Sequence, residues 1–228
     1  MRADDIMSMD VVTVSPDTHV QVVAQKLLDR GVSAVPVVDD QGHILGIISE
    51  GDLMRRRETG GERRPSWWLS LISTTKTNAE AYVKAHGLHA KDVMTRNVIT
   101  VSESTPVNEI AEILEKHRIK RVPVVHQGKI VGIVSRANLL HGLVVQKLEP
   151  ATRDDASMRK SVIKELRETG ADTMVDVVVS NGIVHLWGAV GSTTEKEALQ
   201  VAAENVAGVG SVISHVGIFP QIVQGSVC

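Results

Sequence analysis

Two short motifs in the chain place a hydroxyl and a carboxylate or amide at the same spacing. The Ser49 motif reads Gly46-Ile-Ile-Ser49-Glu-Gly-Asp52, and the Ser135 motif reads Gly132-Ile-Val-Ser135-Arg-Ala-Asn138. Each follows a β-branched run and leads into a predicted helix. A hydroxyl and a carboxylate three positions apart at a helix start can bind the vicinal hydroxyls of a ribose, while helix N-terminal amides favour a phosphate. Helix capping is the alternative, and caps are commoner than ligand sites.

Both motifs belong to a segment that occurs twice. Shifted by 87 positions, residues 5–38 align with residues 92–125 with 14 identities in 34, including Val35–Val38 over Val122–Val125. Two copies are too few for a solenoid, which needs about three or more units to bury its core. The repeat therefore predicts a pseudo-twofold pair with related clefts at the junction, which indicates a binding module.

Each copy is predicted to fold as a βαββα unit. The first copy has a strand at Asp10–Val14, a helix from Pro16-Asp17, strands at Ala34–Val38 and Ile44–Ile48, and a helix from Leu53. The second copy repeats this order with the following elements: a strand at Asn97–Val101, a helix through Val107 and Leu114, strands at Val122–Val125 and Ile130–Val134, and a helix from Leu139.

A helical insert, residues 57–90, separates the copies. Near its start lie Arg55-Arg56-Arg57, Arg63-Arg64 and Trp67-Trp68. Arginines beside tryptophans are compatible with an anionic or membrane surface. The favoured alternative is a solvated helix end whose tryptophans cover a partner subunit or the repeat pair itself.

The C-terminal residues 152–220 are predicted to form a small αββαβ domain. A helix through Met158 and Leu166 precedes two strands joined by Asn181-Gly182, a strong hairpin signal. Ser192-Thr-Thr-Glu195 is a capping box that opens a second helix, and Ser211–Ile218 is the last strand. About 65 residues are few for independent stability, so this domain is expected to pack on a neighbour.

Composition limits the function classes. A net charge of −2 and a pI near 6.5 give no case for nucleic-acid binding, and the single cysteine, Cys228, excludes an internal disulfide. No secretory signal or membrane span is visible in the 228 residues, which predicts a cytoplasmic protein. The Ser49 motif misses the nucleophile-elbow spacing by one residue, and phosphate-loop and dinucleotide fingerprints are absent. We expect no catalytic residues, no metal site and no catalytic cofactor.

The repeated Gly-φ-φ-Ser-x-x-Asp ending (φ, apolar) and the Arg-x-Pro-Val-Val strand at Arg121–Val125 resemble a tandem cystathionine-β-synthase (CBS) domain pair. The resemblance implies an α+β fold with CBS repeats at residues 1–56 and 91–146. It also implies regulatory binding of an adenosine compound (AMP, ADP, ATP or S-adenosylmethionine) in clefts between the repeats. Because CBS modules usually pair, and because Trp67-Trp68 stands out in a chain with 2% aromatic residues, we expect a homodimer.

The resemblance also implies which residues line each cleft. The first cleft takes Ser49, Gly51, Asp52, Asn97, Val98, Ile99, Ile119, Lys120 and Arg121. The second takes Val11, Val12, Val32, Ser33, Ala34, Ser135 and Asn138. The second cleft departs from the family pattern, because Asn138 is not a carboxylate and Ser33-Ala34 offers no cation. A neutral amide is a weaker acceptor than a carboxylate, so the Asp52 cleft is predicted to dominate.

The C-terminal domain resembles a BON domain through Val175–Val179, Asn181–Val190 and Ala207–Ile213. That family is associated with phospholipid or membrane-surface attachment, and a small packing or oligomerisation module is the alternative. The leading hypothesis is a non-enzymatic sensor of an adenosine nucleotide, with the BON domain as output or anchor. The alternative is a membrane-surface or scaffold adaptor whose CBS pair is mainly structural and whose residues 152–220 contact phospholipid or another protein.

Overall fold

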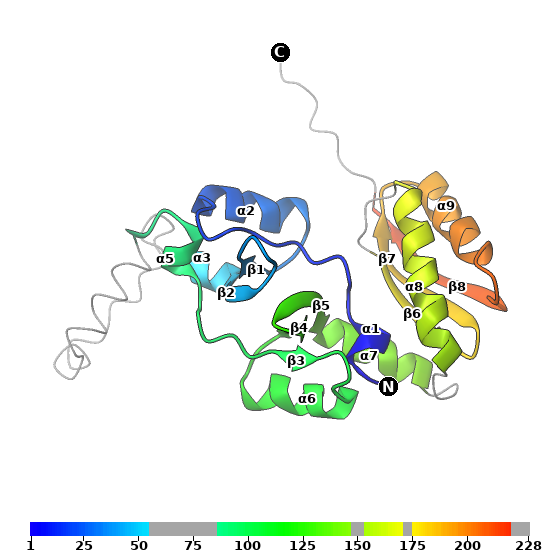
Figure 1. Ribbon diagram of the computed structural model, residues 1–228. Coiled ribbons are helices and arrows are strands. Elements are labelled where there is room, and N and C mark those ends of the chain that lie inside the picture. Colours follow the sequence, from blue (N-terminus) through cyan, green and yellow to red (C-terminus); the bar gives the residue numbers. More distant parts are fainter. Residues whose placement is uncertain (55–85, 147–152, 171–174, 220–228) are drawn as a thin grey trace, which may run out of the picture. The chain divides into compact units, whose positions relative to one another are not determined.

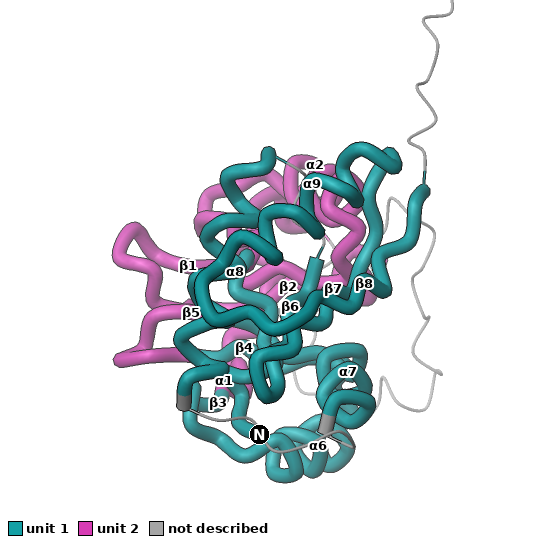
Figure 2. The backbone as a smooth tube through the Cα atoms, turned by 90° about the vertical axis from the view of Figure 1, so that its right-hand side faces the viewer, with its two compact units in different colours: residues 1–10, 101–124, 132–228 teal, residues 11–100, 125–131 magenta. Residues whose placement is uncertain are grey.

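The computed structural model describes residues 1–54, 86–146, 153–170 and 175–219 (Figure 1). Their contacts divide the chain into two compact units (Figure 2). Unit 1 comprises residues 1–10, residues 101–124 and the described chain from residue 132 onward; unit 2 comprises residues 11–100 and 125–131. The arginine and tryptophan pairs of the insert lie outside the described residues, so the homodimer stays a prediction.

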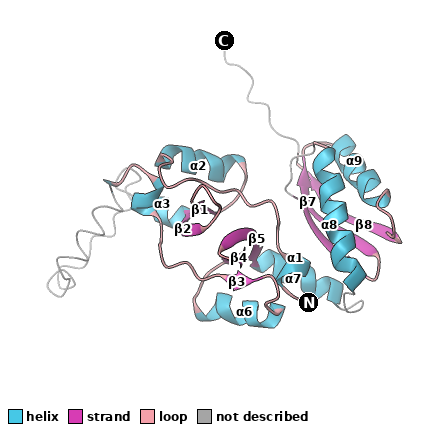
Figure 3. Cartoon of the chain, in the orientation of Figure 1, coloured by secondary structure: helices cyan, strands magenta, loops and turns pink. Residues whose placement is uncertain are grey.

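Unit 2 contains most of the first repeat. Its elements are α2 (Val20–Asp29), β1 (Ala34–Val38), β2 (Ile44–Ser49), α3 (Glu50–Met54) and α5 (Ala90–Val93). Strands β1 and β2 pair antiparallel, with Val35 opposite Ile48 (Figure 3). The apolar positions of α2 at i and i+3 bury Val20 and Val23 against these strands, where Val35 and Ile48 are fully buried. This core fixes the end of β2, at which the Ser49 motif begins.

Unit 1 contains α1 (Ala3–Ile6) of the first repeat, most of the second repeat and the C-terminal domain. The second repeat contributes β3 (Val101–Ser102), α6 (Val107–Lys116), β4 (Arg121–His126), β5 (Lys129–Ser135) and α7 (Arg136–Gln146). The sheet order is β3-β4-β5, and the hairpin of residues 125–131 belongs to unit 2. Helix α6 buries Ile110 and Leu114, which lie about one helical turn apart.

The short segment that leads each repeat packs on the strands of the other repeat. Met7, after α1, covers Gly132 of β5, while Met94, after α5, covers Gly46 of β2. A Cβ at either glycine would overlap the methionine side chain, so both positions need the smallest residue. These contacts explain why the methionine and the glycine are identical in both copies.

The C-terminal domain has the predicted αββαβ order. Its elements are α8 (Arg153–Glu168), β6 (Val175–Ser180), β7 (Ile183–Val190), α9 (Thr193–Glu204) and β8 (Ser211–Ile218). Strand β7 pairs antiparallel with β6 and parallel with β8. Asn181 and Gly182 both have positive φ, as the predicted hairpin requires, and the buried Asp155 carboxylate accepts both of their backbone N–H groups. The Ser192 hydroxyl accepts the Glu195 N–H at 3.2 Å, which is the N-cap half of the predicted capping box, and the Glu195 carboxylate accepts the Gly191 N–H at 3.0 Å.

The α+β class is confirmed, but the start of each repeat differs from the prediction. The expected strand at Asp10–Val14 is reduced to one bridge between Val14 and Val37, and the helix starts at Val20 instead of Pro16. A Ser15–Thr18 turn occupies the intervening residues, because the Thr18 N–H donates to the Ser15 carbonyl at 3.1 Å. Helices α1 and α5 were not predicted. Among the described residues, no helix has the length and apolarity needed to cross a membrane.

Candidate functional site

The Ser49 motif forms a closed hydrogen-bonded turn between β2 and α3. One carboxylate oxygen of Asp52, Oδ2, accepts the Ser49 backbone N–H at 2.9 Å and the Ser49 hydroxyl at 2.6 Å. Asp52 is partly exposed. The turn therefore orients an ionisable carboxylate at the first turn of α3, where the helix dipole favours negative charge.

The Ser135 motif has the same geometry with an amide in place of the carboxylate. The Asn138 carbonyl oxygen, Oδ1, accepts the Ser135 N–H at 2.8 Å and the Ser135 hydroxyl at 2.6 Å. The other side of the amide, Nδ2, is a donor. It donates to Asp176 Oδ2 at 3.0 Å and to Ser8 Oγ at 3.3 Å. Asn138 is only 1% exposed.

The remaining cleft residues are divided between the two units. For the first predicted cleft, Ser49, Gly51, Asp52 and Asn97–Ile99 belong to unit 2, and Ile119–Arg121 belong to unit 1. For the second predicted cleft, Ser135 and Asn138 belong to unit 1. Its other residues belong to unit 2, namely Val11, Val12, Val32, Ser33 and Ala34. Each predicted cleft takes residues from both units, so both clefts remain predictions.

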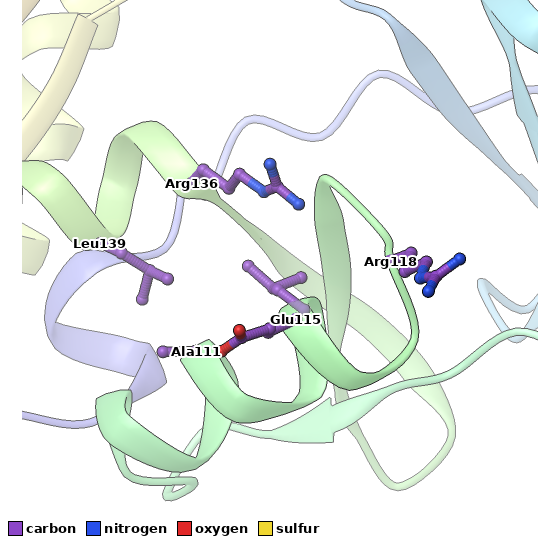
Figure 4. A pocket seen from close by; sticks show the side chains of 6 residues that line it. Ala111, Glu115, Arg118, Arg136 and Leu139 are labelled. Carbon is purple, nitrogen blue, oxygen red and sulfur yellow. The ribbon is translucent and has the colours of Figure 1, made fainter.

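A pocket of about 570 Å³ lies between α6 and α7 of unit 1 (Figure 4). Its lining residues are Ala111, Leu114, Glu115, Arg118, Arg136 and Leu139. Arg136 comes from the start of α7, and Arg118 from the segment just after α6. The Arg136 backbone N–H donates to the Lys120 carbonyl at 3.2 Å, which ties this pocket to the predicted Ile119–Arg121 segment. The volume is within the range of small-ligand sites.

Asp176 is a polar residue of unit 1 that the sequence reasoning missed. It lies in β6, where Val177 and Val179 face the core of the C-terminal domain and Val178 is buried as well. Asp176 Oδ1 accepts the Ser8 hydroxyl at 2.5 Å. A strand with apolar residues at both parities is covered on both faces. Apolar residues on both faces of β6, interrupted only by Asp176, could have indicated that another element packs on the second face of this strand.

Arg159 of α8 joins the same contact from the C-terminal domain. It is 3% exposed, and its guanidinium donates to three backbone carbonyls: those of Val177 at 2.7 Å, Asp4 at 2.9 Å and Met7 at 2.5 Å. Burial lowers the pKa of Arg159 to about 10, so it is still charged at neutral pH. The expectation that the small domain packs on a neighbour is met within unit 1 by α1, α7 and these hydrogen bonds.

Four aromatic rings, here called the ring cluster, continue this contact: His141, Trp187, His215 and His185. The His141 and Trp187 centroids lie 4.6 Å apart with planes 10° from parallel, and Trp187 and His215 lie 3.8 Å apart at 11°. His141 Nδ1 is 3.7 Å from Asp176 Oδ2, too far for a hydrogen bond. Within the described part of the chain, that nitrogen has no hydrogen-bond partner.

Within the ring cluster, the surroundings of His141 and His185 favour the neutral imidazole. Burial lowers the pKa of His141, opposed by the Asp176 carboxylate and assisted by His215. Burial also lowers the pKa of His185, again assisted by His215. Because an imidazolium at either position would be poorly solvated, protonation is expected to weaken the packing.

We therefore expect acidification to destabilise the protein as the pH falls below about 6.5, the ordinary pKa of a histidine. An unfolded histidine titrates near pH 6.5, whereas folded His141 and His185 titrate lower, so the unfolded state binds more protons in this window. Stability is fully present above pH 6.5 and falls as the pH drops toward the folded pKa. Melting temperatures across this range check it. His141→Phe should flatten the dependence.

Two family models match the chain. The CBS domain model matches residues 3–58 and 90–145, and the BON domain model matches residues 154–218. Helices α1 and α5, the unpredicted elements, open the two CBS matches. The second match also contains all of the Ser135 motif, and the first contains all of the Ser49 motif.

Proteins of known sequence and structure are similar to about two thirds of the chain. An uncharacterized protein of Methanocaldococcus jannaschii is 30% identical over 155 residues, which are 63% of this chain and 92% of that protein. Inosine-5'-monophosphate dehydrogenase of Thermoplasma acidophilum is 30% identical over 154 residues, 67% of this chain but 25% of the enzyme. The crystal structure of Arabidopsis thaliana CBSX2 in complex with AMP is similar with a TM-score of 0.56 at 26% identity, covering 64% of this chain and 98% of that one.

Proposed function

The chain belongs to the CBS-domain family, as a tandem CBS pair followed by a BON domain, and on that premise we propose that it is a regulatory protein that binds an adenosine nucleotide. AMP is the first candidate ligand, since the similar structure of CBSX2 contains AMP. The proposed binding residues are Ser49, Gly51 and Asp52, with the segments Asn97–Ile99 and Ile119–Arg121. The BON domain is the proposed output or anchor.

The oriented carboxylate of Asp52 is the observation that carries this proposal. Its Oδ2 atom is fixed by two hydrogen bonds from Ser49, which hold the side chain at the end of β2. A hydrogen bond to a charged acceptor contributes about 1.5–3 kcal/mol, against about 0.5–1.5 kcal/mol for a neutral one. A preorganised carboxylate is therefore a suitable acceptor for the two hydroxyls of a ribose.

The comparison with an enzyme supports a regulatory role instead of a catalytic one. The match to inosine-5'-monophosphate dehydrogenase spans 67% of this chain but only 25% of that enzyme, and this chain has CBS matches at residues 3–58 and 90–145. The CBS pair is thus the shared module, and we propose that in this chain it acts on the BON domain.

Calorimetric titration of the full chain tests the proposal. AMP, ATP and S-adenosylmethionine would each be titrated, with GMP as the control for the base. We expect at least one of the three adenosine compounds to bind with one dominant site per chain. At about 100 times its Kd, that ligand should stabilise the fold by about 2.7 kcal/mol, a melting shift of several degrees. Binding by none of them would overturn the proposal.

A further inference from the structure

The two motifs differ in the hydrogen-bonding character of one group. Both use a single oxygen, Asp52 Oδ2 or Asn138 Oδ1, to accept two hydrogen bonds from the serine. In the Ser135 motif, the second heteroatom of the side chain is an NH₂ group. That group can only donate, whereas a carboxylate oxygen at the same place can only accept.

A matching acceptor faces that donor. Asp176 of the BON domain receives the Asn138 Nδ2 donor on one oxygen, at 3.0 Å, and the Ser8 hydroxyl on the other, at 2.5 Å. An aspartate at position 138 would instead place two carboxylates in contact. Two carboxylates at this separation cannot both stay ionised without strong repulsion. The amide is therefore the residue that this contact requires.

The surroundings of this pair show a built docking surface. Arg159 binds the backbone carbonyls of Asp4 and Met7, on either side of the end of α1, so the guanidinium fixes the segment that carries Ser8. His141, one turn after Asn138 on α7, stacks on Trp187 of β7. The BON domain thus contacts this region at two places: α8 holds the segment that leads to Ser8, and the BON sheet contacts α7 at Asn138 and His141.

We propose that the Ser135 motif is a docking site for the chain's own BON domain, specified by Asn138, and that docking excludes a nucleotide from this motif. The Asn138 amide stands where a ribose would need a carboxylate. Its NH₂ group is a donor, and Asp176 accepts the hydrogen bond from it. The exclusion rests on the proposed nucleotide function, while the docking specificity rests only on the Asn138–Asp176 pair. One ligand site per chain, at the Ser49 motif, is the consequence.

Swapping the side chains of Asn138 and Asp176 tests the docking. Hydrogen exchange by mass spectrometry on the full chain would follow residues 3–10 and 136–146 in wild type, Asn138→Asp, Asp176→Asn and the double variant. Asn138→Asp should speed exchange about ten- to hundredfold, because a buried donor becomes a second carboxylate. Asp176→Asn alone should speed it less, since it removes the charge without creating a repulsion. The double variant restores a donor opposite a carboxylate and should return exchange to within about threefold of wild type.

Two results would overturn the docking part. Exchange in Asn138→Asp equal to wild type would show that the amide does not specify the contact. Failure of the double variant to recover, while its melting remains cooperative, would show that Asp176 is not the partner that Asn138 recognises.

Calorimetry with AMP on the same variants tests the exclusion. Wild type should bind one equivalent, and Asn138→Asp, with its motif uncovered and its carboxylate restored, should bind a second. Two equivalents on wild type, or one on Asn138→Asp, would overturn the exclusion. No binding of AMP to either protein would overturn the exclusion together with AMP as the ligand, and the exchange measurement would still decide the docking specificity.

Discussion

Replacing Asp52 by alanine is expected to weaken AMP binding ten- to hundredfold. The substitution removes the charged acceptor proposed for the ribose hydroxyls, a loss of about 1.5–3 kcal/mol. It also removes the two hydrogen bonds that hold Ser49. Calorimetric titration of wild type and variant gives the ratio of Kd values directly. An unchanged Kd in a folded Asp52→Ala variant would show that AMP does not use this carboxylate.

The chain itself supplies the matched control. Asp52→Asn reproduces the Ser135 motif, in which an amide oxygen accepts the same two hydrogen bonds from serine. We expect this variant to keep the wild-type melting temperature in the absence of ligand. Its affinity for AMP should fall about tenfold, the difference between a charged and a neutral hydrogen bond. A loss of affinity in Asp52→Ala but not in Asp52→Asn would assign the effect to the turn instead of the charge.

Among the variants discussed, Arg159→Ala is expected to cause the largest loss in the free energy of unfolding. It leaves the carbonyls of Val177, Asp4 and Met7 without their buried donor, at about 1–3 kcal/mol each. Removing the buried charge recovers part of this, because burial already disfavours the guanidinium. The net loss should be about 3 kcal/mol, or a fall of roughly 6–12 °C in melting temperature.

Two further variants at α8 separate the causes. Arg167→Ala, at an exposed position of the same helix, should change stability by less than about 0.5 kcal/mol. Arg159→Lys keeps the charge but replaces the planar fork with a point donor, so it should lie between wild type and alanine. Equal melting temperatures for Arg159→Ala and Arg167→Ala would contradict a structural role for the buried arginine.

Local signals predicted most of the fold. The hairpin at Asn181-Gly182 and the helix N-cap at Ser192 are encoded within four residues, and both formed as expected. Strands β1 and β8 were also predicted to within a residue. The four-residue helices α1 and α5 are too short to show a 3.6-residue period. Their only local sign was the shared aspartate: Asp5 accepts the Arg2 N–H at 2.8 Å, and Asp92 accepts the His89 N–H at 3.1 Å.

Contacts between residues close in the sequence could be predicted, whereas contacts between distant residues could not. The Ser49–Asp52 spacing of three residues is visible in the sequence, and its hydrogen bonds follow from it. The partner of Asn138 is 38 residues away in another domain, and periodicity carries no information on such a pair. From the sequence, the lack of a carboxylate at position 138 was interpreted as a weakness of the second cleft. In the structure, the Asn138 amide donates a hydrogen bond to Asp176.

The segment that leads each repeat packs on the strands of the other repeat, and this has a consequence for folding during synthesis. Met7 cannot reach its place over Gly132 until the ribosome has synthesised β5, and its carbonyl meets Arg159, 152 residues later in the chain. At about 5–20 residues per second, the N-terminus waits roughly 8–30 s for that arginine. The first residues to emerge are thus among the last to find their partners. Pairings this distant slow folding, and Gly46 in β2 of the first repeat stays uncovered until Met94 has been synthesised.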